Sequence, residues 1–110
     1  MQMTYDSNPV PVTYGQEELE KVIDEYLNGE TTEFSFKRLC HHIVEKAIFE
    51  GKVRNANNTH YSSRELNPFY SIEVSKCLWK LIWDRKVFIV FGDNPYMAHY
   101  NNDTHFVVNK

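Results

Sequence analysis

The stretch from residue 60 to residue 108, HYSSRELNPFYSIEVSKCLWKLIWDRKVFIVFGDNPYMAHYNNDTHFVV, carries the strongest structural signals in the chain. Its pattern predicts a short helix over 63–67, a tight turn, and a longer helix over 72–85. Three extended runs follow, over 87–91, 96–100 and 104–108, and they predict a β-ribbon over 87–108 with a polar loop inside it.

Local capping signals set the expected helix boundaries in this stretch. Ser62 and Glu65 stand three residues apart, which is the spacing of a capping box. Asn67-Pro68 is expected to end the short helix, because the residue before a proline avoids helical backbone angles. Ser71 is expected to cap the longer helix, because a serine side chain accepts a hydrogen bond from the first turn.

The rest of the chain has two further helical patterns. Apolar residues recur at helical spacing over 16–28 and over 37–50, and Thr and Phe favour a short strand over 32–36. Residues 1–14 contain two prolines and predict an irregular N-terminal arm on the surface. The Asn-rich stretch 52–61 predicts a loop.

The order of short helix, tight turn, longer helix and ribbon with a loop resembles the winged-helix (winged helix-turn-helix) superfamily. The resemblance implies an α+β fold with three main helices, a short one and a C-terminal β-ribbon, in a single domain over 15–110. Residues 37–50 are then the first helix, 63–67 the second, 72–85 the third and 87–108 the ribbon. Winged helices bind DNA, bind RNA or dock proteins, so the fold alone does not choose among these functions.

The longer helix is apolar on two sides. At 100° per residue, one side is expected in the core, and it holds Val74, Leu78, Leu81 and Ile82. If the resemblance holds, the other side is the recognition surface. The expected nucleic-acid contacts are Arg64, Ser71, Ser75, Lys76 and Lys80, of which the lysines suit phosphates. No Arg, Asn or Gln on that side matches a base edge bidentately, so readout of a specific sequence is weakly supported.

A protein interface is the alternative for the same side of this helix. Ile72, Trp79 and Trp83 lie in one sector opposite the expected core, and Trp is enriched in binding hot spots. Three interpretations of the tryptophans stay open: packing within the monomer, an interface with a protein or a second copy, and stacking on a nucleobase. The expected ribbon loop carries no Lys or Arg between Lys86 and Lys110, which departs from DNA-binding wings.

Charge is divided unevenly along the chain. Residues 1–36 carry one basic and eight acidic side chains, whereas residues 37–110 carry eleven basic and seven acidic ones. The basic remainder favours an anionic partner such as DNA. The acidic helix over 16–28 offers a second alternative, in which a small subunit, inhibitor or immunity-type protein neutralises a basic partner. By a small margin the sequence favours nucleic acid.

No catalytic, cofactor or metal motif accompanies these patterns. Cys40, His41 and His42 are adjacent on a helix and point about 100° apart, so they do not chelate one ion together. No phosphate-binding loop, nucleophile elbow or zinc-binding motif is present. We therefore expect a non-enzymatic protein without a cofactor or a small-molecule substrate. Two cysteines and the lack of a membrane-spanning or secretory pattern favour a cytoplasmic protein.

Overall fold

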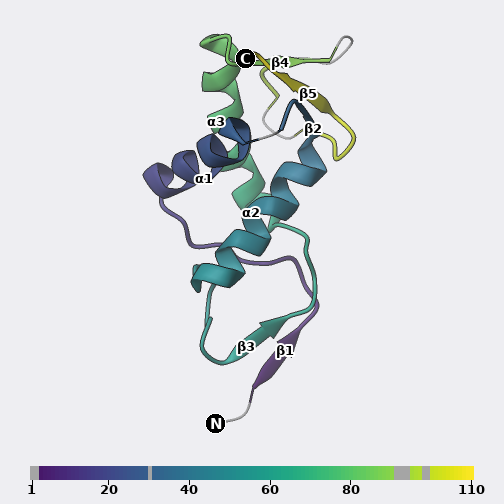
Figure 1. Cartoon of the computed structure of the whole chain (residues 1–110). Coiled ribbons are helices and arrows are strands. Elements are labelled where there is room, and N and C mark those ends of the chain that lie inside the picture. The colour runs from purple at the N-terminus through teal and green to yellow at the C-terminus, as the bar shows by residue number, and fades with distance from the viewer. Residues whose placement is uncertain (1–2, 30, 91–94, 98–99) are drawn as a thin grey trace.

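The computed structural model describes residues 3–29, 31–90, 95–97 and 100–110 (Figure 1). Its helices are α1 (Gln16–Asn28), α2 (Phe36–Glu50) and α3 (Pro68–Trp83). The strands within the described residues are β1 (Thr4–Asp6), β2 (Glu33–Ser35), β3 (Thr59–Tyr61), β4 (Val87–Ile89) and β5 (His105–Val108). The chain is therefore an α+β protein with helices and two small sheets.

The first two helices lie where the sequence predicts them. α1 has the expected bounds, and the Glu18 side chain accepts a hydrogen bond from the Gly15 N–H at 3.2 Å. α2 begins one residue early, because Ser35 caps it by accepting a hydrogen bond from the Arg38 N–H at 3.1 Å. Gly51 ends α2 with a φ of 71°, a left-handed angle that glycine adopts without steric cost.

The third helix begins four residues earlier than predicted. Asn67 does not end a helix but starts one, since its side chain accepts a hydrogen bond from the Phe69 N–H at 2.9 Å. Pro68 fits the first helical position because no intrahelical bond needs its missing N–H there. Ser71, the expected cap, lies inside the first turn, and α3 ends at Trp83 rather than at residue 85.

The short helix predicted over 63–67 is wrong. Residues 62–65 have no regular secondary structure, and the Ser63 hydroxyl accepts a hydrogen bond from the Glu65 N–H at 3.0 Å. The backbone groups of this segment bond to Val10 instead. The Val10 N–H donates to the Glu65 carbonyl at 2.7 Å, and the Val10 carbonyl accepts from the Asn67 N–H at 3.1 Å. This pairing with a distant segment replaces helical bonds. α2 and α3 are therefore joined by the long connection 51–67, not by a tight turn.

The C-terminal ribbon is part of a three-stranded antiparallel sheet with the order β2-β5-β4. β5 pairs with β4 on one side and with β2 on the other. The outer predicted strands are confirmed over shorter spans, as β4 and β5. The one predicted over 96–100 is not a strand at residues 95–97 or at residue 100, and residues 91–94 and 98–99 lie outside the described part.

The N-terminal segment is anchored in the molecule, although it was expected as a surface arm. Val10, Val12 and Tyr14 are buried in the core. β1 pairs in parallel with β3, and this ribbon lies at the end of the molecule opposite the C-terminus (Figure 1). The chain is accordingly elongated, with extents of 49 × 23 × 21 Å.

The core joins all three helices to the inner face of the sheet. Val74, Leu78 and Leu81 of α3 are buried, as predicted, while Ile82 is half-buried against the same core. Other members come from α2 and from the sheet, namely Leu39, Ile43, Phe34 and Phe106. The rings of Phe34 and Phe106 stack at 5.3 Å across β2 and β5. Within the described residues, none of the helices has the length and apolar character needed to cross a membrane.

Candidate interaction site on the third helix

Side chains of α3 recur at alternating steps of three and four residues on one side of the helix. The alternation averages 3.5 residues, close to one helical turn, so these side chains lie on one face as they do in a coiled-coil seam. We call this set the α3 stripe, and it consists of Phe69, Ile72, Lys76, Trp79 and Trp83.

The two ends of the α3 stripe are aromatic and open to solvent. Phe69 is 83% exposed and Trp83 is 76% exposed. Ile72 and Trp79 are half-buried between them, and Lys76 is exposed. Trp79 is fixed to the loop that follows β4, because its indole Nε1 donates to the Met97 carbonyl at 2.8 Å. The stripe thus includes an immobilised tryptophan beside one that projects into water.

The expected nucleic-acid contacts do not form one surface. Ser71 and Ser75 are buried, and their hydroxyls donate to the carbonyls of Pro68 at 2.6 Å and Ser71 at 3.1 Å. They face the core and do not present donors to a phosphate. Arg64 lies in the connection before α3, where its Nη1 donates to the Tyr61 carbonyl at 3.1 Å. Of the expected nucleic-acid contacts, only Lys76 and Lys80 are exposed basic side chains on α3.

The charge of these lysines is offset by nearby carboxylates. Lys76 Nζ lies 3.4 Å from Glu73 Oε1 on the same helix, an exposed pair that contributes little to stability. Lys80 lines a groove between α1 and α3, together with Glu20 and Asp84. The solvent face of α3 is therefore a mixture of aromatic and oppositely charged side chains, not a basic surface.

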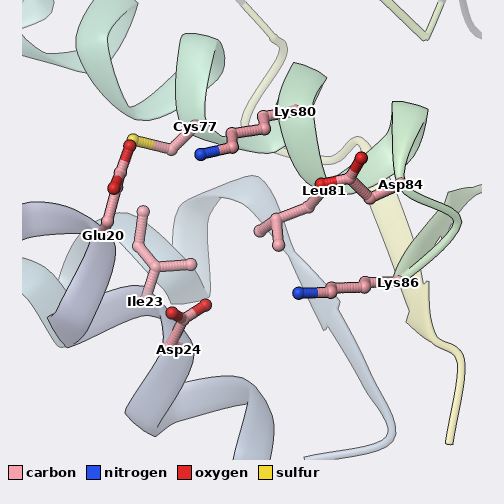
Figure 2. A pocket seen from close by; sticks show the side chains of 8 residues that line it. All are labelled: Glu20, Ile23, Asp24, Cys77, Lys80, Leu81, Asp84 and Lys86. Carbon is pink, nitrogen blue, oxygen red and sulfur yellow. The ribbon is translucent and has the colours of Figure 1, made fainter.

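The groove between α1 and α3 consists of three adjoining hollows. The central one has a cavity volume of about 80 Å³, and those on either side have about 410 and 370 Å³. We call it the α1–α3 groove. The central hollow, shown in Figure 2, is lined by Glu20, Ile23, Asp24, Cys77, Lys80, Leu81, Asp84 and Lys86.

Opposite charges face each other across the α1–α3 groove. In Figure 2, Lys80 reaches from α3 toward the side of Glu20, and Lys86 points toward the side of Asp24 on α1. Cys77 lies beside Glu20, and burial, with a contribution from Glu20, raises the pKa of the thiol to about 11. The groove is therefore lined by opposite charges, with Glu20 and Asp24 on α1 facing Lys80 and Lys86.

The acidic helix α1 is partly engaged within the chain. Glu18 pairs with Lys52 at 3.1 Å, and the Gly15 N–H together with Lys52 holds the pKa of the Glu18 carboxyl below its usual range. Of its other carboxylates, Glu17, Asp24 and Glu25 are exposed, and Glu20 is half-buried beside the α1–α3 groove. Glu17 and Glu18 lie in the first turn, where their charge complements the helix dipole.

The adjacent Cys40, His41 and His42 lie in separate environments. Burial raises the pKa of the Cys40 thiol to about 12. His42 packs against Tyr26 with ring centroids 4.7 Å apart, and burial lowers its pKa. Within the described ranges, no group of three or more His, Cys, Asp or Glu side chains is placed to hold a metal ion.

Comparison of this chain with protein-family models, with curated proteins and with solved structures gave no match. The interaction site therefore has to be inferred from its own geometry.

The sequence prediction missed Phe69 and Glu73 as part of this face. Phe69 is separated from Ile72 and Lys76 by the three- and four-residue steps of a helical seam, so the signal was present in the sequence. With Ser71 as the expected cap, Phe69 falls outside the predicted helix. The cap at Asn67 brings it onto the stripe.

Proposed function

We propose that this chain is a protein-binding module of winged-helix type, and that the α3 stripe is its binding face. The winged-helix part of the proposal is supported by three helices, of which the last leads directly into an antiparallel ribbon. In that assignment α1, not residues 37–50, is the first helix and α2 is the second. The long connection 51–67 between α2 and α3 is a departure from a tight helix-turn-helix.

The exposure of Phe69 and Trp83 on one face of α3 carries the functional proposal. Leaving a large aromatic side chain in water forgoes about 1.5–3 kcal/mol relative to burial. A helix that is apolar on two faces is expected to be covered on both. In this chain the inner face is covered by the core, while the stripe has two uncovered aromatic ends. Trp79 supplies a rigid, half-buried centre to the same face.

A protein partner fits this face better than nucleic acid does. A phosphate backbone favours unpaired Lys and Arg, and base edges favour Arg, Asn or Gln. Lys76 is instead paired with Glu73, and Lys80 borders a groove with acidic residues. Interfaces between proteins are enriched in aromatic residues, which is the composition of the stripe. DNA binding by Lys76 and Lys80 stays a prediction of the sequence, and the experiment below tests it too.

Site-specific photo-crosslinking in cells tests the proposal. A benzophenone amino acid replaces Trp83 in one variant and Phe49 in another. Phe49 is a matched control because it is 88% exposed but lies on α2, away from the stripe. Position 83 is expected to yield protein adducts that position 49 does not. Equal yields at the two positions, or none at position 83, would contradict the proposal.

A titration with random duplex DNA at low and moderate salt accompanies the crosslinking. The protein-binding proposal expects no salt-dependent DNA binding. Binding that weakens when Lys76 and Lys80 are both replaced by Ala, with a log–log salt slope reduced by about 0.9 per lost phosphate contact, would favour the nucleic-acid function instead.

A further inference from the structure

We propose that the partner of the α3 stripe is a second copy of this chain, docked with its α3 antiparallel to the first. The inference rests on the proposed function, because it uses the same face of α3. What it adds is the identity of the partner and the register in which it docks. The charges and side-chain sizes along the helix argue for both.

The stripe has the spacing of a helix-packing seam. Alternating steps of three and four residues place knobs that fit the holes of a facing helix. A two-fold axis perpendicular to both helices makes one face complementary to itself, which is the symmetry of most homodimers. With the axis near the middle of the segment 72–83, Ile72 lies opposite Trp83 of the second copy. The smaller side chain of each helix then meets the larger one of its partner.

The charges beside the stripe select this register. Glu73 and Lys80 flank the stripe on the same side and are both exposed. In the register described, Glu73 of each copy lies across from Lys80 of the other, which gives two opposite-charge pairs in place of the weak exposed pair of Glu73 with Lys76. Shifting the helices by one heptad toward the start of α3 brings the two Glu73 residues together, which is unfavourable. Charges that flank a helix seam commonly determine partner and orientation in this way.

The central lysine of the stripe also has a place in this arrangement. Lys76 lies opposite Trp79 of the second copy. Its exposed pair with Glu73 is weak, so the ammonium group exchanges that pair for a cation–π interaction over the indole face. Trp79 is held by its hydrogen bond to the Met97 carbonyl, so the ring is ordered before the partner arrives. The lysine in the middle of the aromatic stripe therefore contributes a contact to the proposed dimer.

The end residue Phe69 is expected to contribute less than Trp83. The paired segment runs over 72–83, so Phe69 lies at its margin. An interface built on one helix face is smaller than the roughly 800 Å² per partner of a standard complex. We therefore expect a weak dimer, with a dissociation constant on the order of 10 µM.

Sedimentation equilibrium of the purified full chain, over concentrations spanning the micromolar range, tests the dimer. Trp83→Ala is expected to raise the dissociation constant by about 30-fold or more, and Phe69→Ala by less. Phe49→Ala, which removes an equally exposed aromatic outside the stripe, is expected to leave it unchanged. A wild type that stays monomeric throughout overturns the inference, as does a Trp83→Ala variant that associates like the wild type.

Charge exchange tests the register. Glu73→Lys alone and Lys80→Glu alone each place like charges across the seam, and each is expected to weaken the dimer about tenfold. The double variant restores opposite charges and is expected to return to within about threefold of the wild type. Thermal unfolding of the monomers controls for damage to the fold. Single variants that weaken the dimer without rescue by the double variant overturn the antiparallel register.

The two proposals fail in distinguishable ways. A chain that is monomeric when pure but forms adducts with another protein from position 83 overturns the second copy and leaves the protein-binding module standing. A chain that forms no adduct from position 83 and does not self-associate overturns both.

Discussion

The two faces of α3 both carry apolar side chains, but in opposite surroundings. Val74 and Leu78 on the inner face are fully buried, whereas Phe69 and Trp83 on the outer face are mostly exposed. The inner face packs against a core built from α1, α2 and the sheet. The difference therefore comes from what lies across from each face, not from the hydrophobicity of the helix itself. In the proposed complex, a second apolar surface would cover the outer face as the core covers the inner one.

The largest expected effect is the loss of stability when a side chain on the inner face is truncated to alanine, compared with the same change on the outer face. Leu78→Ala removes a fully buried side chain and is expected to lower the free energy of unfolding by about 2–5 kcal/mol. Trp83→Ala is the matched variant on the outer face, and we expect a change within about 0.5 kcal/mol for the monomer. Chemical denaturation at a concentration below the dimer range measures both. Equal losses would mean that Trp83 is covered within the monomer.

The alkylation rate of the Cys77 thiol tests how well the inner side of α3 is shielded from solvent. Burial raises the pKa of this thiol from 9.0 to about 11, so at pH 8 its thiolate fraction is about a hundredfold lower than in the unfolded chain. Alkylation of the native protein should be slower than alkylation in urea by at least that factor. Since the folded pKa is the higher one, the stability that the protonated thiol contributes is present below pH 9.0 and is lost as the pH rises through about 11.

Cys40 provides the control for this measurement. It lies in α2 with a thiol pKa raised to about 12, so it is expected to react more slowly than Cys77. In a Cys77→Ser variant, the alkylation measured comes from Cys40. Alkylation of native Cys77 at the rate seen in urea would show that the α1–α3 groove leaves the sulfur open to solvent.

The smallest effect concerns the cap that brings Phe69 onto the outer face. Asn67→Ala removes the side-chain acceptor of the Phe69 N–H and is expected to cost about 1 kcal/mol of stability. Asn67→Asp keeps the acceptor and serves as the matched control. Far-ultraviolet circular dichroism during urea unfolding measures both variants. Full stability of Asn67→Ala would argue that α3 begins later, without Phe69 on its outer face.

Local signals predicted the fold well where the chain makes its own hydrogen bonds. The bounds of α1, the stop of α2 at Gly51 and the burial of Leu78 follow from amphipathic spacing and from glycine at a helix end. The strands β2, β4 and β5 are found close to where β-branched and aromatic runs occur. The helices among these elements need little information beyond their own residues, and the strands are marked by their composition although β2 pairs with the distant β5.

The errors lie where a distant segment decides the local structure. Ser62 and Glu65 have the spacing of a capping box, but Val10 takes up the backbone groups of Glu65 and Asn67. Such a pairing across the chain leaves no periodic signal near residue 65. Asn67-Pro68 was ambiguous for a different reason, since this dipeptide both ends and begins helices. The misplaced start of α3 then left Phe69 out of the predicted face.

The parallel pairing of β1 with β3 has a consequence for the order of folding. Each partner, such as Thr4 and Thr59, comes from a distant part of the chain, and each strand has only three residues. Closing so long a loop costs entropy that a few hydrogen bonds offset poorly, whereas the contacts within each helix are local. We therefore expect the ribbon to form after the helices have condensed and to be the first region to open. Amide hydrogens of β1 are expected to exchange with solvent faster than those of α2, although Val10 beside it is fully buried.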